Sequence, residues 1–230
     1  MRSSFYAVIF DLDGVLADSE PWWNQIDAKL LAEHGISYRG EHHRSVLGVS
    51  YRVAVEFYKD AFHIAASVEE LIRRRGEIAT DFFANRVGLF PCAKTTLEKL
   101  REMKLHLAVA TSSLSSSAHP LMDRTAIRSL FSVVVTGDEV QQGKPHPDIY
   151  LRAAKKLGIS PEACLVVEDS LAGIAAGRAA KMRVAAIPDR RFVDPREYEN
   201  DANYVLGSLS EIAAFIHRVN AAASEKHALG

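Results

Sequence analysis

Two aspartates stand directly after a short apolar run near the start of the chain, in the segment Asp11-Leu12-Asp13-Gly14. A carboxylate can attack phosphorus and form an acyl-phosphate, which splits one difficult displacement into two easier steps. Asp13, two residues beyond Asp11, is spaced to protonate the leaving alkoxide and later to deprotonate the attacking water. The segment alone fits a solvated turn after a strand equally well, so other residues must decide between the two interpretations.

Three more polar segments follow later apolar runs, either at once or after a short loop. They are Thr111-Ser112, Lys144 and Glu168-Asp169. Lys144 could neutralise a phosphate ester, and the Thr111 hydroxyl with the Ser112 backbone N–H could hold phosphate oxygens. Each segment also has an ordinary structural explanation, since Lys144 could be an exposed loop lysine and Glu168-Asp169 could cap a helix.

The candidate site would combine several carboxylates with one cationic side chain. The carboxylates are those of Asp11, Asp13, Glu168 and Asp169, and the cation is Lys144. Repulsion among the acids calls for a bound cation. The ligands would all be oxygen, with no cysteine or histidine in the motifs, which favours magnesium over calcium or zinc. Magnesium often binds a few carboxylates together with substrate phosphate oxygens, so the pattern predicts a Mg2+ site that acts on phosphate.

Short apolar runs rich in valine, alanine and isoleucine predict the strands that must position these residues. The runs cover residues 6–10, 107–110, 133–135, 165–167 and 184–187. None alternates cleanly between polar and apolar residues, which is typical of parallel strands covered on both faces. Helix-like stretches between the later strands indicate an α/β fold with right-handed crossovers. Because the carboxyl ends of parallel strands share one edge of the sheet, we expect the polar segments to converge there.

The interval from residue 17 to residue 90 interrupts this alternation with helical periodicity and no convincing strand. Its helical stretches cover residues 22–34, 53–62 and 68–85. We interpret the interval as a helical cap inserted after the first strand, and Arg73-Arg74-Arg75 as a solvated helix face. The predicted division is a Rossmann-like core at 1–16 and 91–220, a cap at 17–90 and a flexible tail at 221–230.

The overall composition argues against several classes of protein. A formal net charge of -1 gives no global field that would favour nucleic acid or an anionic membrane. No apolar run has the length of a membrane span, and the N-terminal run leads into acids without a signal-peptide cleavage site. Cys92 and Cys164 are the only cysteines, and we interpret them as reduced, partly buried thiols. We therefore expect a cytoplasmic enzyme that binds neither nucleic acid nor membrane.

Taken together, the polar segments resemble the four motifs of the haloacid dehalogenase-like superfamily, in the same order and after the corresponding strands. The matching residues are Asp11-Leu12-Asp13-Gly14-Val15-Leu16, Thr111-Ser112, Lys144-Pro145, and Glu168-Asp169-Ser170 with Gly173. The resemblance covers nearly the whole chain. It implies a parallel-sheet Rossmann-like core, with a helical cap after the first strand that closes over the sheet and excludes water.

The resemblance also implies a role for each motif residue. Asp11 corresponds to the nucleophile and a magnesium ligand. Asp13 corresponds to the general acid and base, and its backbone carbonyl also binds magnesium. Asp169 corresponds to a magnesium ligand, and Glu168 either to a ligand or to a residue directly behind one. The phosphate-binding set corresponds to Thr111, Ser112 and Lys144.

Within the superfamily, the chain resembles the branch of sugar-phosphate phosphatases and beta-phosphoglucomutases, and the stretch from Asp18 to Trp23 is similar to the 2-deoxyglucose-6-phosphatase type. Beta-phosphoglucomutases have a histidine where this chain has Trp23, which favours a phosphatase over a mutase. The glycine usual after the proline of the second connection is absent from Pro91-Cys92, which leaves the conformation there open. Asp13 argues against carbon–halogen hydrolysis, because true haloacid dehalogenases lack the second aspartate.

Three cap residues are candidates for substrate specificity, namely Trp23, Gly48 and Arg52. Gly48, Val49 and Arg52 resemble the specificity segment of the family, although the start of a helix with one surface arginine explains them equally well. Trp23 could line the pocket, or it could pack in the core of the cap.

The sequence therefore predicts a Mg2+-dependent enzyme that hydrolyses a small phosphomonoester, such as a sugar phosphate, through an aspartyl-phosphate. A sugar phosphomutase is the alternative enzyme, and a non-catalytic phosphate-binding regulator on the same fold is the alternative outside enzymes. A degenerate regulator would be expected to lose Asp11 or Asp13, and both are present. We expect a monomer, because the motifs and the cap are complete in one chain.

Overall fold

A parallel β-sheet forms the centre of the computed structural model, which describes residues 4–39, 42, 45–46 and 49–228. The strands are ordered β5-β4-β1-β6-β7-β8. Their bounds are β1 Ala7–Phe10, β4 His106–Ala110, β5 Val133–Val135, β6 Cys164–Glu168, β7 Arg183–Ala186 and β8 Tyr204–Val205. The predicted strands and the α/β class are confirmed. The structure adds β8, because a strand of 2 residues is too short to give a periodic signal in the sequence.

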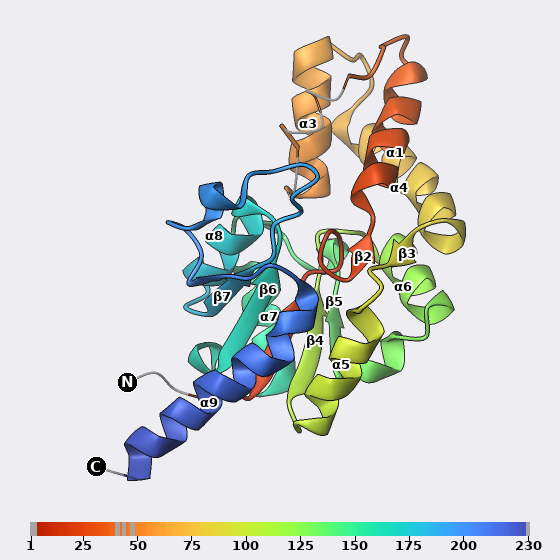
Figure 1. The fold of residues 1–230 in the computed structure, drawn as a ribbon. Helices are drawn as coiled ribbons and strands as arrows, with labels where there is room; N and C mark the ends of the chain where they lie inside the picture. Colours follow the sequence, from red (N-terminus) through yellow and green to blue (C-terminus); the bar gives the residue numbers. More distant parts are fainter. Residues whose placement is uncertain (1–3, 40–41, 43–44, 47–48, 229–230) are drawn as a thin grey trace.

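Helices pack on both faces of this sheet (Figure 1). One hydrophobic core contains side chains of α5 (Ala93–Glu102), α6 (Ser115–Arg124) and α9 (Ile212–Ala228), and the other contains side chains of α7 (Asp148–Leu157) and α8 (Leu171–Ala179). Alternate residues of β1 enter the two cores, Val8 and Phe10 the first, Ala7 and Ile9 the second. Every residue of β1 is therefore buried, which explains why its sequence shows no polar alternation.

Strand β1 lies between β4 and β6, although these strands are distant from it in sequence. The register pairs Phe10 with Val109 of β4 and with Val167 of β6. These pairs put the carboxyl ends of the three strands at one level, so the residues that follow each strand meet at one edge of the sheet. The helical insert stands over this edge in Figure 1.

The helical insert contains α1 (Glu20–Ala32), α3 (Tyr51–Phe62) and α4 (Val68–Asn85). Serine side chains start two of these helices, since Ser50 caps α3 and Ser67 forms a capping box with Glu70 at α4. Two short antiparallel strands, β2 (Ala17–Asp18) and β3 (Gly88–Leu89), connect the insert to the sheet. The sequence predicted no strand in this interval, because strands of 2 residues leave no period to detect.

The last helix reaches into the predicted tail of the chain. Helix α9 continues to Ala228, through most of the predicted flexible tail at 221–230. The added turns are rich in alanine and include Glu225 and Lys226, which are good helix formers. For the rest of the chain, we propose a core at 1–16 and 91–220 and a cap at 17–90 that meet at β2 and β3.

Candidate active site

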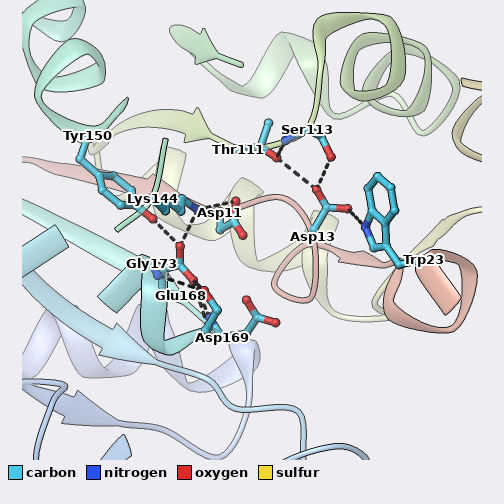
Figure 2. Close-up of polar contacts among 11 residues, drawn as sticks. Asp11, Asp13, Trp23, Thr111, Ser113, Lys144, Tyr150, Glu168, Asp169 and Gly173 are labelled. Atoms are coloured by element: carbon cyan, nitrogen blue, oxygen red, sulfur yellow. Dashed lines mark hydrogen bonds and ion pairs between the residues drawn. The ribbon is translucent and has the colours of Figure 1, made fainter. Parts of the chain in front are cut away.

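The residues that follow β1, β4 and β6 meet at the edge of the sheet beneath the cap (Figure 2). Asp11 follows β1 and donates its backbone N–H to the Val167 carbonyl of β6 at 2.9 Å. Thr111 follows β4 directly. Glu168 ends β6, and Asp169 comes next. The fold thus brings together motif residues that lie far apart in the chain.

Three buried carboxylates could hold a metal ion, because one oxygen each from Asp11, Glu168 and Asp169 lies within 4.8 Å of the others. A set of donors made only of oxygen suits a hard divalent cation. Gly14 shapes the same place, since its φ is +71° and a Cβ there would lie 1.9 Å from Asp169 Oδ2. Glycine is therefore needed where the backbone approaches the Asp169 carboxylate.

The negative charges of this triad oppose one another. Burial raises the pKa of Asp11 to about 8, because the opposing effect of Lys144 is smaller and Glu168 adds repulsion. Burial also raises the pKa of Asp169 well above its usual range, and the charges of Glu168 and Glu20 add to the shift. Both acids are thus destabilised as anions until a cation joins them, as expected at a divalent-metal site.

Magnesium should stabilise the protein more strongly at about pH 8 than at about pH 5. In the metal-free folded protein, Asp11 and Asp169 keep protons that they lose in the unfolded chain. The free energy of unfolding without metal therefore falls as pH rises from about 4 to about 8. A metal ion must displace those protons, so it binds more tightly where they are already lost. At 100 times its Kd, a ligand adds about 2.7 kcal/mol to the free energy of unfolding.

Melting temperatures with excess Mg2+ and with a chelator, measured at both pH values, check this prediction. An Asp169→Asn variant is the control and should gain little from magnesium at either pH. An equal gain at both pH values in the wild type would contradict the metal assignment.

Lys144 lies between two of these acids, inside the site and not in an exposed loop (Figure 2). Its Nζ is 3.0 Å from Asp11 Oδ1 and 2.5 Å from Glu168 Oε1, and its side chain is 1% exposed. Burial alone would lower the pKa of Lys144, but the carboxylates of Asp11 and Glu168 raise it above its usual value. The ammonium therefore stays charged next to the proposed nucleophile.

The Glu168 carboxylate accepts hydrogen bonds on both oxygens. Tyr150 Oη donates to Oε1 at 2.6 Å, and the backbone N–H groups of Asp169 and Ser170 donate to Oε2 at 3.0 and 3.1 Å. Burial disfavours the charge of Glu168, but the neighbouring ammonium and these donors hold its pKa below the usual value. A Cβ on Gly173 would lie 1.7 Å from Oε1, so only glycine leaves room for this arrangement.

Three side chains donate hydrogen bonds to Asp13, and one of them belongs to the cap (Figure 2). Trp23 Nε1 donates to Oδ1 at 3.0 Å. Thr111 Oγ1 and Ser113 Oγ donate to Oδ2 at 3.1 and 2.7 Å. The Thr111 hydroxyl, predicted to hold phosphate, thus orients Asp13 in this structure. Sequence reasoning did not single out Ser113, although it extends the Thr111-Ser112 motif by one hydroxyl.

Core and cap residues line a partly open cavity of about 50 Å3 over these acids. Its lining includes Asp13, Ser112 and Asp169 from the core and Trp23, Tyr51 and Arg75 from the cap. A volume of this size holds a few water molecules. A sugar phosphate is much larger than this space.

Arg75 contradicts the interpretation of the arginine run as a solvated helix face. It is 6% exposed, and its Nε and Nη2 lie 2.7 and 3.2 Å from the two carboxylate oxygens of Asp27. Its guanidinium lies 4.5 Å from the ring centre of Trp23 and 4.7 Å from that of Tyr51. The Arg74 side chain is 40% exposed and forms ion pairs with Glu33 and Glu77. The local pattern could not separate the two arginines, because helix α1 creates the burial.

The specificity candidates occupy different places. Trp23 is 7% exposed and lines the cavity. Arg52 has a side chain that is 54% exposed, and it forms ion pairs with Glu56 at 3.5 Å and Glu69 at 3.2 Å. It does not line the cavity over the acids. Gly48 lies outside the described residues.

Known proteins are similar to this chain in sequence and in fold. The haloacid dehalogenase-like hydrolase family matches residues 8–187. The chain belongs to this family. It is 34% identical over 174 residues to a phosphorylated carbohydrates phosphatase of Thermotoga maritima. The aligned segment covers 76% of this chain and 81% of that relative. It is also 30% identical over 216 residues to hexitol phosphatase B of Escherichia coli O157:H7. That aligned segment covers 90% of this chain and 94% of the relative.

A solved member of the family agrees in fold. The crystal structure of CbbY from Rhodobacter sphaeroides in complex with phosphate matches with a TM-score of 0.80 and 25% identity, over 90% of this chain and 96% of that chain. The predicted family, fold class and enzyme class are therefore confirmed, and the chain is a haloacid dehalogenase-like phosphatase. The family implies a divalent metal, and the buried triad of Asp11, Glu168 and Asp169 fits one.

Proposed function

We propose that the chain is a magnesium-dependent phosphatase that hydrolyses a small sugar or polyol phosphomonoester through an aspartyl-phosphate on Asp11. The observation that carries the proposal is the place of Asp11, which lies 3.0 Å from the buried ammonium of Lys144 and within the carboxylate triad. Relatives named for phosphorylated carbohydrates and for hexitol phosphate hydrolysis support the substrate class.

Asp11 and Asp169 are the acids best suited to hold Mg2+, together with the backbone carbonyl of Asp13. Their pKa values are raised, whereas the Glu168 oxygens already accept from several donors. When bound, the ion would neutralise phosphate charge and help to stabilise the transition state. Lys144 would add a fixed positive charge beside Asp11.

In the proposed reaction, an Asp11 oxygen bonds to phosphorus as the ester P–O bond breaks, and the leaving oxygen takes a proton from Asp13. A water then attacks the phosphorus of the aspartyl-phosphate and gives a proton back to Asp13. The P–O bond to Asp11 breaks, which releases inorganic phosphate and restores the carboxylate. Trp23 can only donate to Asp13, so it supplies no second base at the position where mutases have histidine.

The wild type should release inorganic phosphate from sugar and polyol monophosphates when magnesium is present. Removing the metal with a chelator should lower the rate at least about a hundredfold, because the charge that opposes attack is no longer neutralised. A panel assay for phosphate release, with magnesium, with chelator, and with magnesium added back, checks both points. Interconversion of sugar phosphates without phosphate release would support a mutase instead, and phosphate binding without turnover would support a regulator.

We also propose that the enzyme acts as a monomer whose cap opens to admit substrate. Residues of both the core and the cap line the catalytic cavity. Among the helices that the structure describes, none is both long and apolar enough to cross a bilayer.

A further inference from the structure

Tyr150 is a buried residue beside the active site to which the proposed reaction gives no role. It lies in the first turn of α7, and it is 0% exposed. Its hydroxyl donates to Glu168 Oε1 at 2.6 Å (Figure 2). Tyr150 does not line the catalytic cavity, so it can act on the reaction only through the residues that it contacts.

The two oxygens of Glu168 are held by separate groups. Oε1 accepts from Tyr150 Oη at 2.6 Å and from Lys144 Nζ at 2.5 Å. Oε2 accepts from the backbone N–H groups of Asp169 and Ser170 at 3.0 and 3.1 Å. A carboxylate oxygen has two lone pairs, so the phenol and the ammonium together occupy Oε1. The carboxylate is thereby fixed at both oxygens.

Lys144 depends on this carboxylate for its place. A lysine carries its charge on a long flexible chain, so the ammonium needs contacts at its end to stay at one point. Here Nζ lies between Glu168 Oε1 at 2.5 Å and Asp11 Oδ1 at 3.0 Å. The Tyr150 ring supports the same ammonium, since the ring centre lies 5.3 Å from Nζ. Tyr150 therefore contacts both the ammonium that lies beside the proposed nucleophile and the acid that holds this ammonium.

We propose that Tyr150 is a positioning residue for phosphoryl transfer, whose hydroxyl fixes Glu168 so that Glu168 holds the Lys144 ammonium beside Asp11. The inference rests on the proposed phosphatase function. Without the hydroxyl, Oε1 regains a lone pair and the Glu168 carboxylate can turn, which lets the ammonium move away from the transferring phosphoryl group. Displacing a charge that stabilises the transition state lowers kcat more than it weakens substrate binding.

Tyr150→Phe tests the proposal, because it removes the hydroxyl and keeps the ring beside Lys144. At saturating Mg2+, kcat for the best sugar or polyol monophosphate should fall about tenfold, and KM should stay within about threefold of the wild-type value. In a Lys144→Met background, the same substitution should change kcat/KM by less than about twofold, since no ammonium remains to be positioned. Steady-state kinetics of the wild type, both single variants and the double variant measure these effects.

Tyr58→Phe is the matched control. Tyr58 is also 0% exposed, and its hydroxyl donates to the buried Asp27 carboxylate at 2.8 Å. Asp27 pairs with the Arg75 cation at 2.7 Å, so a phenol, a carboxylate and a cation meet in the cap as they do around Glu168. Tyr58 does not line the catalytic cavity. The two phenylalanine variants should lose similar stability in urea unfolding, but Tyr58→Phe should keep kcat within about twofold of the wild-type value.

The outcomes separate this inference from the function on which it rests. A kcat that falls in Tyr150→Phe but not in Tyr58→Phe, with no further fall in the Lys144→Met background, supports the proposal. A wild-type kcat in Tyr150→Phe at saturating Mg2+, or an equal fall in both phenylalanine variants, overturns it and leaves the phosphatase intact. A wild type that releases no phosphate overturns both.

Two further outcomes test the route through Lys144. A fall in kcat/KM that is equally large with and without Lys144 overturns the proposal, because Tyr150 would then act through another group. A change only in the Mg2+ concentration that gives half-maximal activity also overturns it, because Tyr150 would then act on the metal site. If Lys144→Met does not fold, the comparison of Tyr150→Phe with Tyr58→Phe decides.

Discussion

Asp11→Asn should lower kcat/KM for phosphate release at least about a thousandfold, because a neutral amide is a far weaker nucleophile than a carboxylate. The amide keeps the size of the side chain and cannot form the acyl-phosphate. Two measurements check the result, phosphate release from the best substrate of the panel and intact mass during turnover. The wild type should show a species heavier by one phosphoryl group, and the variant should not.

The same variant should be more stable than the wild type when metal is absent. Burial and the neighbouring acids raise the pKa of Asp11 to about 8, so the wild type loses stability as pH rises from about 4 towards 8. Asparagine has no charge to bury, so the difference between variant and wild type should widen with rising pH. Urea unfolding at several pH values in the presence of a chelator measures this difference.

Opposite changes in activity and stability distinguish a lost nucleophile from a damaged fold. Asp194→Asn is a suitable control, since Asp194 pairs with Arg196 on the surface, where the arginine side chain is 82% exposed. This control should keep wild-type activity, because exposed pairs contribute little. An Asp11→Asn enzyme as active as the wild type would disprove the proposed mechanism.

The sheet and the convergence of the motif residues could be predicted because each depends on local sequence. A strand buried on both faces must be apolar throughout, as β1 is, and the polar residue that follows it must lie at the edge of the sheet. The positions of Asp11 and Glu168 at this edge follow from the rule without any knowledge of the cap. Gly14 and Gly173 could be recognised as motif residues, but the carboxylates they accommodate are visible only in the structure.

Residues whose environment comes from another element could not be predicted in the same way. Arg75 pairs with Asp27 inside α1, whereas Arg74 pairs with Glu33 at the end of that helix. The Thr111 hydroxyl points to Asp13, and a sequence pattern cannot tell this partner from a phosphate oxygen. Tyr51 was not singled out, because its contacts with Trp23 and Arg75 are visible only in the structure.

Lys144→Met should reduce both stability and activity. Methionine keeps an unbranched apolar side chain but removes the ammonium that lies 3.0 Å from Asp11 and 2.5 Å from Glu168. Removing one partner of a buried ion pair costs about 3–5 kcal/mol, because the remaining charge is uncompensated. The rate of phosphate release should fall at least about a hundredfold, since the site loses the fixed positive charge that would stabilise the phosphate ester. Urea unfolding and the phosphate assay measure the two effects.

The stability loss in Lys144→Met should grow as pH rises. In the wild type the ammonium and the hydrogen-bond donors lower the pKa of Glu168 against the effect of burial, so the carboxylate stabilises the fold above its unfolded-state pKa. Without the ammonium, Glu168 is buried favourably only when protonated. The folded variant then binds more protons than the unfolded chain and loses stability as pH increases.

Lys156→Met is the control for this pH dependence, because Lys156 forms an ion pair with Glu139 at 2.6 Å and its side chain is 39% exposed. This substitution should cost no more than about 1 kcal/mol, with little change across the pH range. A Lys144→Met loss that is constant with pH, or as small as that of the control, would show that Lys144 is not the charge that balances the buried acids. A loss that widens with pH would instead explain why this lysine is buried, since two carboxylates can share the site only while a cation lies between them.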